Sequence, residues 1–173
     1  MWFALRVTYG RELKFQKLLQ EAGFATFVPM KKKKLEIAGK TVTRIVPAVS
    51  NLCFVDTDKA VLDNFIFLLG SESPARYIWD KATGKPAIVP KLAMESFIKV
   101  CSVMADDTLY LKEITPQLRV GTRVRVTEGP FKGVEGFVAR IKKSRRIVVE
   151  LPGMLAVATT YVEPQSLERI ENQ

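Results

Sequence analysis

The chain has 173 residues and a mass of 19.5 kDa, which leaves room for one ordinary domain or two small ones. It carries 27 lysines and arginines, 18 aspartates and glutamates and no histidine, so its formal charge is +9. This excess of positive charge favours a polyanionic partner. The absence of histidine excludes Ser-His-Asp, Cys-His and His-metal sites, and we expect no enzymatic activity, no metal and no cofactor.

The cysteines and the hydropathy of the sequence indicate the cellular compartment in which the protein is expected. Cys53 and Cys101 lie in apolar segments without CxxC spacing, so neither a zinc site nor a disulfide scaffold is indicated. The longest apolar stretch, 61–69, is too short to span a bilayer, and the N-terminus lacks the pattern of a signal peptide. We therefore expect a cytoplasmic protein with buried, structural cysteines, no membrane partner and a monomeric state.

Charge is distributed unevenly along the chain. Residues 1–100 hold 16 basic and 9 acidic side chains, residues 101–117 hold 1 and 3, and residues 118–173 hold 10 and 6. The hydrophobic pattern also changes across the acidic stretch, from mixed helix and strand signals to short β-type runs. The sequence therefore predicts two domains, 1–101 and 118–173, joined by a linker at 102–117.

The first domain is predicted to be an antiparallel sheet with flanking helices. The pattern predicts strands at 2–7, 25–30, 52–56 and 76–79, and helices at 11–22, 58–69 and from residue 90 onward. Residues 31–46 read as a basic hairpin that turns at Gly39 and projects from the body. Helix 58–69 is expected to bury Val61 and Leu62. Trp2 and Trp79 are expected to be structural.

The second domain is predicted to be a small β barrel. Five short runs, at 122–127, 136–143, 146–151, 154–159 and 166–170, have strand patterns separated by Gly and Pro turns. Closing them into a barrel would remove free sheet edges. The fold class is therefore α+β, with an N-terminal sheet, a linker and a C-terminal SH3-like barrel.

Five stretches, one in the C-terminal part and four in the N-terminal part, resemble the NusG family. Residues 124–138, Val-Arg-Val-Thr-Glu-Gly-Pro-Phe-Lys-Gly-Val-Glu-Gly-Phe-Val, resemble the KOW motif. Residues 2–7, Trp-Phe-Ala-Leu-Arg-Val, the Gly-Arg-Glu opening of helix 11–22, Phe27-Val-Pro-Met before the hairpin and Lys85-Pro-Ala-Ile-Val-Pro before the last helix look like the NusG N-terminal domain. Together they cover nearly the whole chain, in the family's order.

The resemblance implies a transcription elongation factor that binds the clamp helices of RNA polymerase. Its N-terminal domain would use a surface containing Val49, Leu52 and Phe54, although core packing is an equal alternative for Phe54. Its KOW domain would recruit a second factor or the ribosome through Leu151, Pro152 and Met154. The chain departs from the family at both surfaces. At 49–52 it has Val-Ser-Asn-Leu where the family usually has Phe-Pro-Gly-Tyr, and at Pro152 and Met154 it lacks the family's aromatic and basic contacts.

Some segments look more like a specialised paralogue such as RfaH. They are Val28-Pro-Met, Asn51 followed by an apolar residue, and Pro86-Ala-Ile-Val-Pro. Such members relieve pausing and termination in selected operons, so antitermination is the expected activity. Some of them store the KOW domain as a helical hairpin. We expect strands here, because β-branched residues dominate 124–149 and glycines and prolines interrupt any long helix.

The basic side chains have two explanations. Lys31, Lys32, Lys33 and Lys34 are expected to contact phosphates of DNA in the elongation complex, with nascent RNA as a further partner; the alternative is a solvated charge run. Arg11 and Lys14 would extend the same nucleic-acid surface, although helix solubility explains them equally well. The competing function is a KOW-containing RNA- or ribosome-binding protein, which accounts for the charge but not for the N-terminal pattern.

Overall fold

The computed structural model describes residues 1–173 except 9, 104–107, 112–120, 142 and 171–173. The chain divides into two compact units, one formed by Met1–Met30 and Val46–Lys91 and the other by Lys31–Ile45 and Leu92–Gln173. The first unit holds a five-stranded sheet and the second a six-stranded sheet. The predicted α+β class is confirmed.

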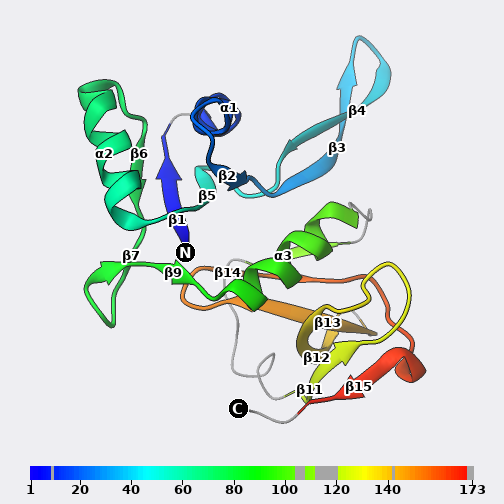
Figure 1. Ribbon diagram of the computed structural model, residues 1–173. Helices are drawn as coiled ribbons and strands as arrows, with labels where there is room; N and C mark the ends of the chain where they lie inside the picture. The colour runs from blue at the N-terminus through cyan, green and yellow to red at the C-terminus, as the bar shows by residue number, and fades with distance from the viewer. Residues whose placement is uncertain (9, 104–107, 112–120, 142, 171–173) are drawn as a thin grey trace. The chain divides into compact units, whose positions relative to one another are not determined.

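The first unit alternates strands and helices (Figure 1). Its elements are β1 (Trp2–Val7), α1 (Glu12–Glu21), β2 (Ala25–Phe27), β5 (Leu52–Asp56), α2 (Lys59–Leu69), η1 (Gly70–Glu72), β6 (Ala75–Tyr77), β7 (Trp79–Asp80), β8 (Lys85–Pro86) and β9 (Ile88–Val89). The sheet order is β2-β5-β1-β6, and β9 also pairs with β1, all antiparallel. Strand β1 and strand β5 have the predicted boundaries.

One face of this sheet packs against the two helices. Alternate residues of β1 and β5 point to that face, where Leu5 pairs with Cys53 and Phe3 with Val55. The core cluster there contains Phe3, Leu5, Val7, Phe15, Leu19, Val28, Cys53, Val55, Leu62 and Ala75, all at most 3% exposed. Phe15 and Leu19 come from α1 and Leu62 from α2, so both helices cover the same face.

The opposite face of the sheet is also buried. Ala4, Leu52 and Phe54 lie on it, because they alternate with the core residues, and their exposed fractions are 0%, 4% and 0%. Phe54 lies directly opposite Ala4 of β1 and Phe27 of β2. Strand β5 is therefore buried on both faces, unlike the half-buried strand that its alternation suggested.

Helix α2 exposes one residue that was predicted to be buried. Leu62 is fully buried, whereas Val61 is 52% exposed, since adjacent helix positions point about 100° apart. Near the end of the same helix, Phe67 and Leu68 are 80% and 74% exposed. The prediction that Val61 belongs to the core was wrong, because three consecutive apolar or small residues, Ala60 to Leu62, do not reveal which of them faces the sheet.

The second unit contains a hairpin, a helix and an antiparallel sheet (Figure 1). Its elements are β3 (Met30–Ile37), β4 (Lys40–Pro47), α3 (Lys91–Val103), β10 (Leu109–Leu111), β11 (Arg123–Val126), β12 (Glu135–Ile141), β13 (Ser144–Leu151), β14 (Leu155–Ala158), η2 (Pro164–Ser166) and β15 (Leu167–Arg169). The sheet order is β10-β14-β13-β12-β11-β15. All five predicted C-terminal strands are confirmed, and residues 136–141 and 144–151 are strands, not helices.

The stretch predicted as a linker contributes to this unit. Strand β10 pairs with β14, with Tyr110 opposite Val157. Helix α3, most of which the sequence-based division assigns to residues 1–101, contacts the first residue of β12, where Ser96 Oγ accepts a hydrogen bond from the Glu135 N–H at 3.1 Å. The remaining linker residues, 104–107 and 112–117, lie outside the described residues. The domain boundaries themselves stay a prediction.

The Gly-rich turn between β11 and β12 is closed by its own backbone. Gly133 N–H donates to the carbonyl of Val126 at 2.7 Å, and Lys132 N–H donates to that of Gly129 at 3.1 Å. Gly129 and Gly133 have φ angles of 75° and 86°, which side chains other than glycine rarely adopt. Phe131 is only 4% exposed, so the turn buries its central aromatic ring beside the strands.

Both cysteines are buried, as predicted. Burial raises the pKa of each thiol from 9.0 to about 12, and the negative charge of Glu12 adds to the effect at Cys53. At pH 8 roughly one thiol in ten thousand is then ionised. We therefore expect neither cysteine to react with iodoacetamide in the native chain and both to react after unfolding, as mass spectrometry would record.

These thiols also make stability depend on pH. Their folded-state pKa lies above the unfolded value, so they favour folding below pH 9 and lose that contribution as the pH rises from 9 toward 12. The melting temperature should fall in this window. The Cys53→Ala/Cys101→Ala chain should show a shallower fall, and an equally steep fall would contradict the assignment.

Candidate nucleic-acid and polymerase interface

Helix α1 presents basic side chains beside a buried apolar stripe. Phe15 and Leu19 are buried in the core, which leaves Arg11, Lys14 and Lys17 exposed. Arg11 occupies the position before the first helical residue, with φ −94° and ψ 12°. The helix pattern therefore separates a core side from a cationic side, as the sequence predicted for Arg11 and Lys14.

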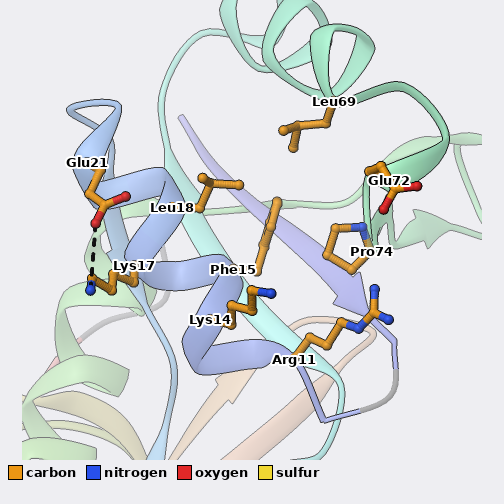
Figure 2. A pocket seen from close by; sticks show the side chains of 9 residues that line it. All are labelled: Arg11, Lys14, Phe15, Lys17, Leu18, Glu21, Leu69, Glu72 and Pro74. Atoms are coloured by element: carbon orange, nitrogen blue, oxygen red, sulfur yellow. Dashed lines mark ion pairs between the residues drawn. The ribbon is translucent and has the colours of Figure 1, made fainter.

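A pocket of about 440 Å³ lies along this cationic side (Figure 2). Helix α1 forms one wall, and the segment that runs from the end of α2 through η1 to Pro74 forms the other. Leu18 and Leu69 face one another across the pocket, with the ring of Phe15 between the walls. The floor of the pocket is thus apolar. The volume of the pocket lies in the range of pockets that bind small molecules.

Charge is distributed unevenly within the pocket. At one end Lys17 forms an ion pair with Glu21 at 3.8 Å, as Figure 2 shows. At the other end, near Pro74, Arg11 forms no ion pair with any residue that the structure describes, and neither does Lys14 beside it. Glu72 lines this end too, beside Pro74, so the end holds two cations and one carboxylate next to apolar contact surface, and this excess of one positive charge suits an anionic group attached to an apolar body.

The four hairpin lysines lie next to one another on one strand of a two-stranded ribbon. Lys31–Lys34 are all exposed in β3, which pairs with β4. Because successive side chains of a strand point to opposite faces, Lys31 and Lys33 share one face of the ribbon and Lys32 and Lys34 the other. A single phosphate backbone lying on one face therefore meets two of the four lysines.

The hairpin turn has the geometry expected from its sequence. Two residues, Ala38 and Gly39, join the strands, and their φ angles are 51° and 75°. Positive φ at both central positions defines the turn type that matches the twist of paired strands. The turn predicted at Gly39 is confirmed. Among the hairpin's apolar side chains, Ile45 is 56% exposed and Ile37 43%.

A buried carboxylate holds the loop that enters β5. Glu12, in the first turn of α1, is only 4% exposed, and its Oε1 accepts a hydrogen bond from the Asn51 N–H at 2.6 Å. Asn51 has a φ of 62°, a conformation that asparagine tolerates better than most residues, and its carbonyl accepts from the Val7 N–H at 3.0 Å. The chain direction between Val49 and Leu52 is therefore fixed by α1 and β1.

The residues predicted to contact polymerase are mostly covered. Val49 is half-buried in this loop, Leu52 is 4% exposed and Phe54 is fully buried. The burial of the Phe54 side chain favours the core-packing alternative for it. Among these three residues, Val49 offers the accessible surface.

The residues predicted to bind a partner in the C-terminal unit lie at the β13–β14 turn. Pro152 is exposed and Met154 is half-buried, whereas Leu151 is fully buried. Met154 N–H donates to the Leu151 carbonyl at 3.1 Å, and Gly153 between them has a φ of 71°. A partner at this turn would meet Pro152 and Met154, because Leu151 points into the sheet core.

Sequence reasoning missed two features. Trp79, expected to be structural, is 59% exposed. An Asp-x-x-x-Gly turn signature from Asp80 to Gly84 follows it and would have indicated a ribbon there. The apolar floor of the pocket was also missed, because Leu18 and Leu69 are brought together only by tertiary packing of α1 against residues 69–74, which leaves no local signal.

Other classes of site are not found among the described residues. That part of the chain contains no group of three or more cysteine, aspartate or glutamate side chains arranged to hold a metal ion. Nor does any helix in it combine the length and the apolar character needed to cross a membrane.

The fold, the basic side chains of α1 and the lysines of the β3–β4 hairpin together indicate a class of protein, one that binds nucleic acid. A basic α+β chain presents cations along one helix, at an apolar pocket, and on both faces of an exposed ribbon. This arrangement is expected of proteins that contact nucleic-acid backbones.

The chain belongs to the NusG family, since the family model described as "Transcription termination factor nusG" matches residues 1–98, more than half of its length. Its role therefore lies in transcription elongation. A solved structure described as "Domain interaction in Thermotoga maritima NusG" aligns with 98% of this chain and 97% of its own, at 15% identity and a TM-score of 0.46. No curated protein matches the sequence.

Proposed function

We propose that this protein binds RNA polymerase during elongation and suppresses pausing or termination in selected operons, as a specialised, RfaH-like member of its family. The family match over residues 1–98 carries the proposal. Val28-Pro-Met before the hairpin and Pro86-Ala-Ile-Val-Pro before α3 favour the specialised branch. The protein acts by binding, as a cytoplasmic monomer.

The polymerase contact in this proposal centres on the loop before β5. Val49 supplies accessible apolar surface there, and Leu52 and Phe54 support it from inside the sheet. The hydrogen bond from Asn51 to Glu12 fixes the loop before any partner arrives, which lowers the entropy lost on binding. The clamp helices are the proposed partner of this surface.

The DNA contact uses the hairpin lysines and the cationic end of the α1 pocket. Ammonium groups act as point charges, so they hold phosphates without reading bases. Arg11 and Lys14 have no competing ion pair among the described residues, which leaves their charge available to DNA or to nascent RNA. At the β13–β14 turn, Pro152 and Met154 would receive a second factor or the ribosome.

The two faces of the hairpin give a direct test of the DNA contact. If phosphates lie along one face, the Lys31→Ser/Lys33→Ser and Lys32→Ser/Lys34→Ser chains will behave differently, although both lose two charges. One of them should flatten the dependence of log K for DNA on log salt by roughly 1.4 to 1.8, at ~0.7–0.9 for each lost contact. Fluorescence anisotropy with labelled DNA measures this slope.

The paired variants control for one another because they have the same net charge. Equal, small losses in both would show that the lysines act only through the general charge of the chain. An unchanged slope in both would show that the hairpin is a solvated surface. Either result would remove the hairpin from the proposed DNA contact.

One observation favours the competing function, an RNA- or ribosome-binding protein. In the β12–β13 hairpin Arg140 and Arg145 are exposed and lie directly opposite each other, with Lys143 in the turn. Like charges at opposed positions destabilise a sheet, and among the described residues no acidic side chain pairs with either arginine. A polyanion bound there would relieve this repulsion.

Affinity capture of the tagged full-length chain separates the two functions. We expect core RNA polymerase to co-purify at low salt and to remain after nuclease treatment. Capture of ribosomes without polymerase would favour the competing function. Capture of neither would contradict both.

A further inference from the structure

A short ribbon at the edge of the first unit holds its shape through its own turn. Strands β7 and β8 pair Trp79 with Pro86 and Asp80 with Lys85. The carboxylate of Asp80 accepts hydrogen bonds from the Ala82 N–H at 2.8 Å and from the Thr83 hydroxyl at 3.1 Å, and the Asp80 carbonyl accepts from the Gly84 N–H at 2.9 Å. The side chain of Asp80 is thus committed to the turn.

The ribbon is also tied to the main sheet. Ile78 N–H donates to the Ala4 carbonyl at 3.0 Å, and Ala87 N–H donates to the Ile78 carbonyl at 2.8 Å. Immediately after Ala87, β9 pairs with the beginning of β1. Trp79 is therefore presented by backbone that is hydrogen-bonded on both sides, not by a loose loop.

Trp79 is 59% exposed, although its side chain is a large aromatic one whose burial would contribute more to stability than that of most other side chains. The other tryptophan of the chain, Trp2, is half-buried in β1. Pro86, directly across the ribbon, is half-buried, and Ile88 two residues further on is 51% exposed. A rigid, flat aromatic surface thus stands open on the first unit.

The charge around this indole is positive. Lys85 pairs with Asp80, so its side chain leaves the ribbon on the face opposite Trp79, and Lys81 lies in the turn two residues after Trp79; both lysines are exposed. Neither lysine forms an ion pair with a described residue, and the Asp80 carboxylate, which is hydrogen-bonded within the turn, keeps its charge, so the three residues together carry a net charge of +1. The ribbon therefore combines an aromatic side chain on one face with one ammonium group at its turn and another on its opposite face.

We propose that the β7–β8 ribbon is a binding site for single-stranded nucleic acid, in which one base stacks on Trp79, a flanking phosphate contacts Lys81 at the turn, and Lys85 on the opposite face adds to the local positive potential. Every base has a π face, so such a site tolerates any sequence, while its lysines make binding depend on salt. The site shares no residue with the α1 pocket or with the hairpin lysines, and it goes beyond the polymerase and phosphate contacts proposed above.

A protein partner fits the same ribbon less well. Tryptophan is enriched at protein interfaces, but lysine is depleted there because its ammonium group is costly to dehydrate. Beside a stacked base the same lysines remain partly hydrated, and Lys81 gains a phosphate partner. The pairing of one open indole with two uncommitted lysines therefore favours the nucleic acid.

The chain's two tryptophans allow a site-specific test. In the Trp2→Phe chain, Trp79 is the only fluorophore of its kind, and we expect its emission to be quenched saturably when oligo(dT) is added to the full-length protein. Trp79→Ala should weaken oligo(dT) binding about 5- to 150-fold, the effect of losing one stacked base, whereas Trp79→Phe should retain most of it. Lys81→Ser/Lys85→Ser should flatten the salt dependence.

Three outcomes would overturn the proposal. They are an unquenched indole at saturating oligo(dT), equal binding by the Trp79→Ala and Trp79→Phe chains, and an indole that responds only when polymerase is added, which would assign the ribbon to a protein partner. The Lys31→Ser/Lys33→Ser and Lys32→Ser/Lys34→Ser chains should still show the quench, so failure of the hairpin contact remains distinguishable. Because Trp79 is exposed, its variants should melt within a few degrees of the parent chain, which far-ultraviolet circular dichroism checks.

Discussion

Replacing Phe54 with alanine is expected to lower the free energy of unfolding by about 3–5 kcal/mol. The ring is fully buried between Ala4 and Phe27 on the neighbouring strands, so its removal loses apolar burial and leaves a cavity in β5. Phe67→Ala is the matched control, because the same ring is 80% exposed there and should change stability by less than about 0.5 kcal/mol. Urea denaturation of both chains gives the comparison.

The same pair of variants shows what Phe54 does for polymerase binding. If Phe54 is only a core residue, its alanine variant should bind polymerase normally once affinity is expressed per folded molecule. If Phe54→Ala lowers stability no more than Phe67→Ala does and also weakens polymerase binding, Phe54 is not a core residue. Its side chain would then contact polymerase directly.

Replacing Gly136 with alanine should destabilise the C-terminal sheet by about 2–4 kcal/mol. A Cβ at this position would lie 2.3 Å from the Val148 carbonyl oxygen and 2.9 Å from a methyl group of Ile147. Backbone atoms of β13 cannot move aside without separating the two strands. Thermal melting followed by circular dichroism measures the loss.

Gly129 in the neighbouring turn is the control for this prediction. Its φ is 75°, but a Cβ there would meet nothing within 4 Å. Gly129→Ala should therefore cost only the backbone strain, about 1–2 kcal/mol. If Gly129→Ala proves more damaging than Gly136→Ala, close approach of β12 to β13 is not the reason for the glycine at 136.

The long strands of this protein could be predicted because their patterns are local. Residues 2–7 and 52–56 form β1 and β5 with the predicted boundaries, since each is an apolar run bounded by polar residues. The hairpin turn at Gly39 was equally visible. Three of the shortest strands, β7, β8 and β10, were not predicted, because two or three residues are fewer than the window over which periodicity appears.

The candidate site could be predicted in part. Exposed cations at Arg11, Lys14 and Lys31–Lys34 follow directly from the helix pattern and the charge run. Burial of Phe54 could not be predicted, because alternation identifies two faces of a strand but not whether both are covered. The α1 pocket depends on contacts between residues about fifty positions apart, and only the structure brings them together.

Transcription with purified cognate RNA polymerase, on a template that carries a pause site and a terminator, tests the central claim most directly. Adding the full-length chain should shorten the pause and increase read-through, and the Lys31–Lys34 variant that flattens the salt slope should do so less well. A longer pause, more termination or no effect on either would contradict the proposal that this NusG-family protein is an antitermination factor.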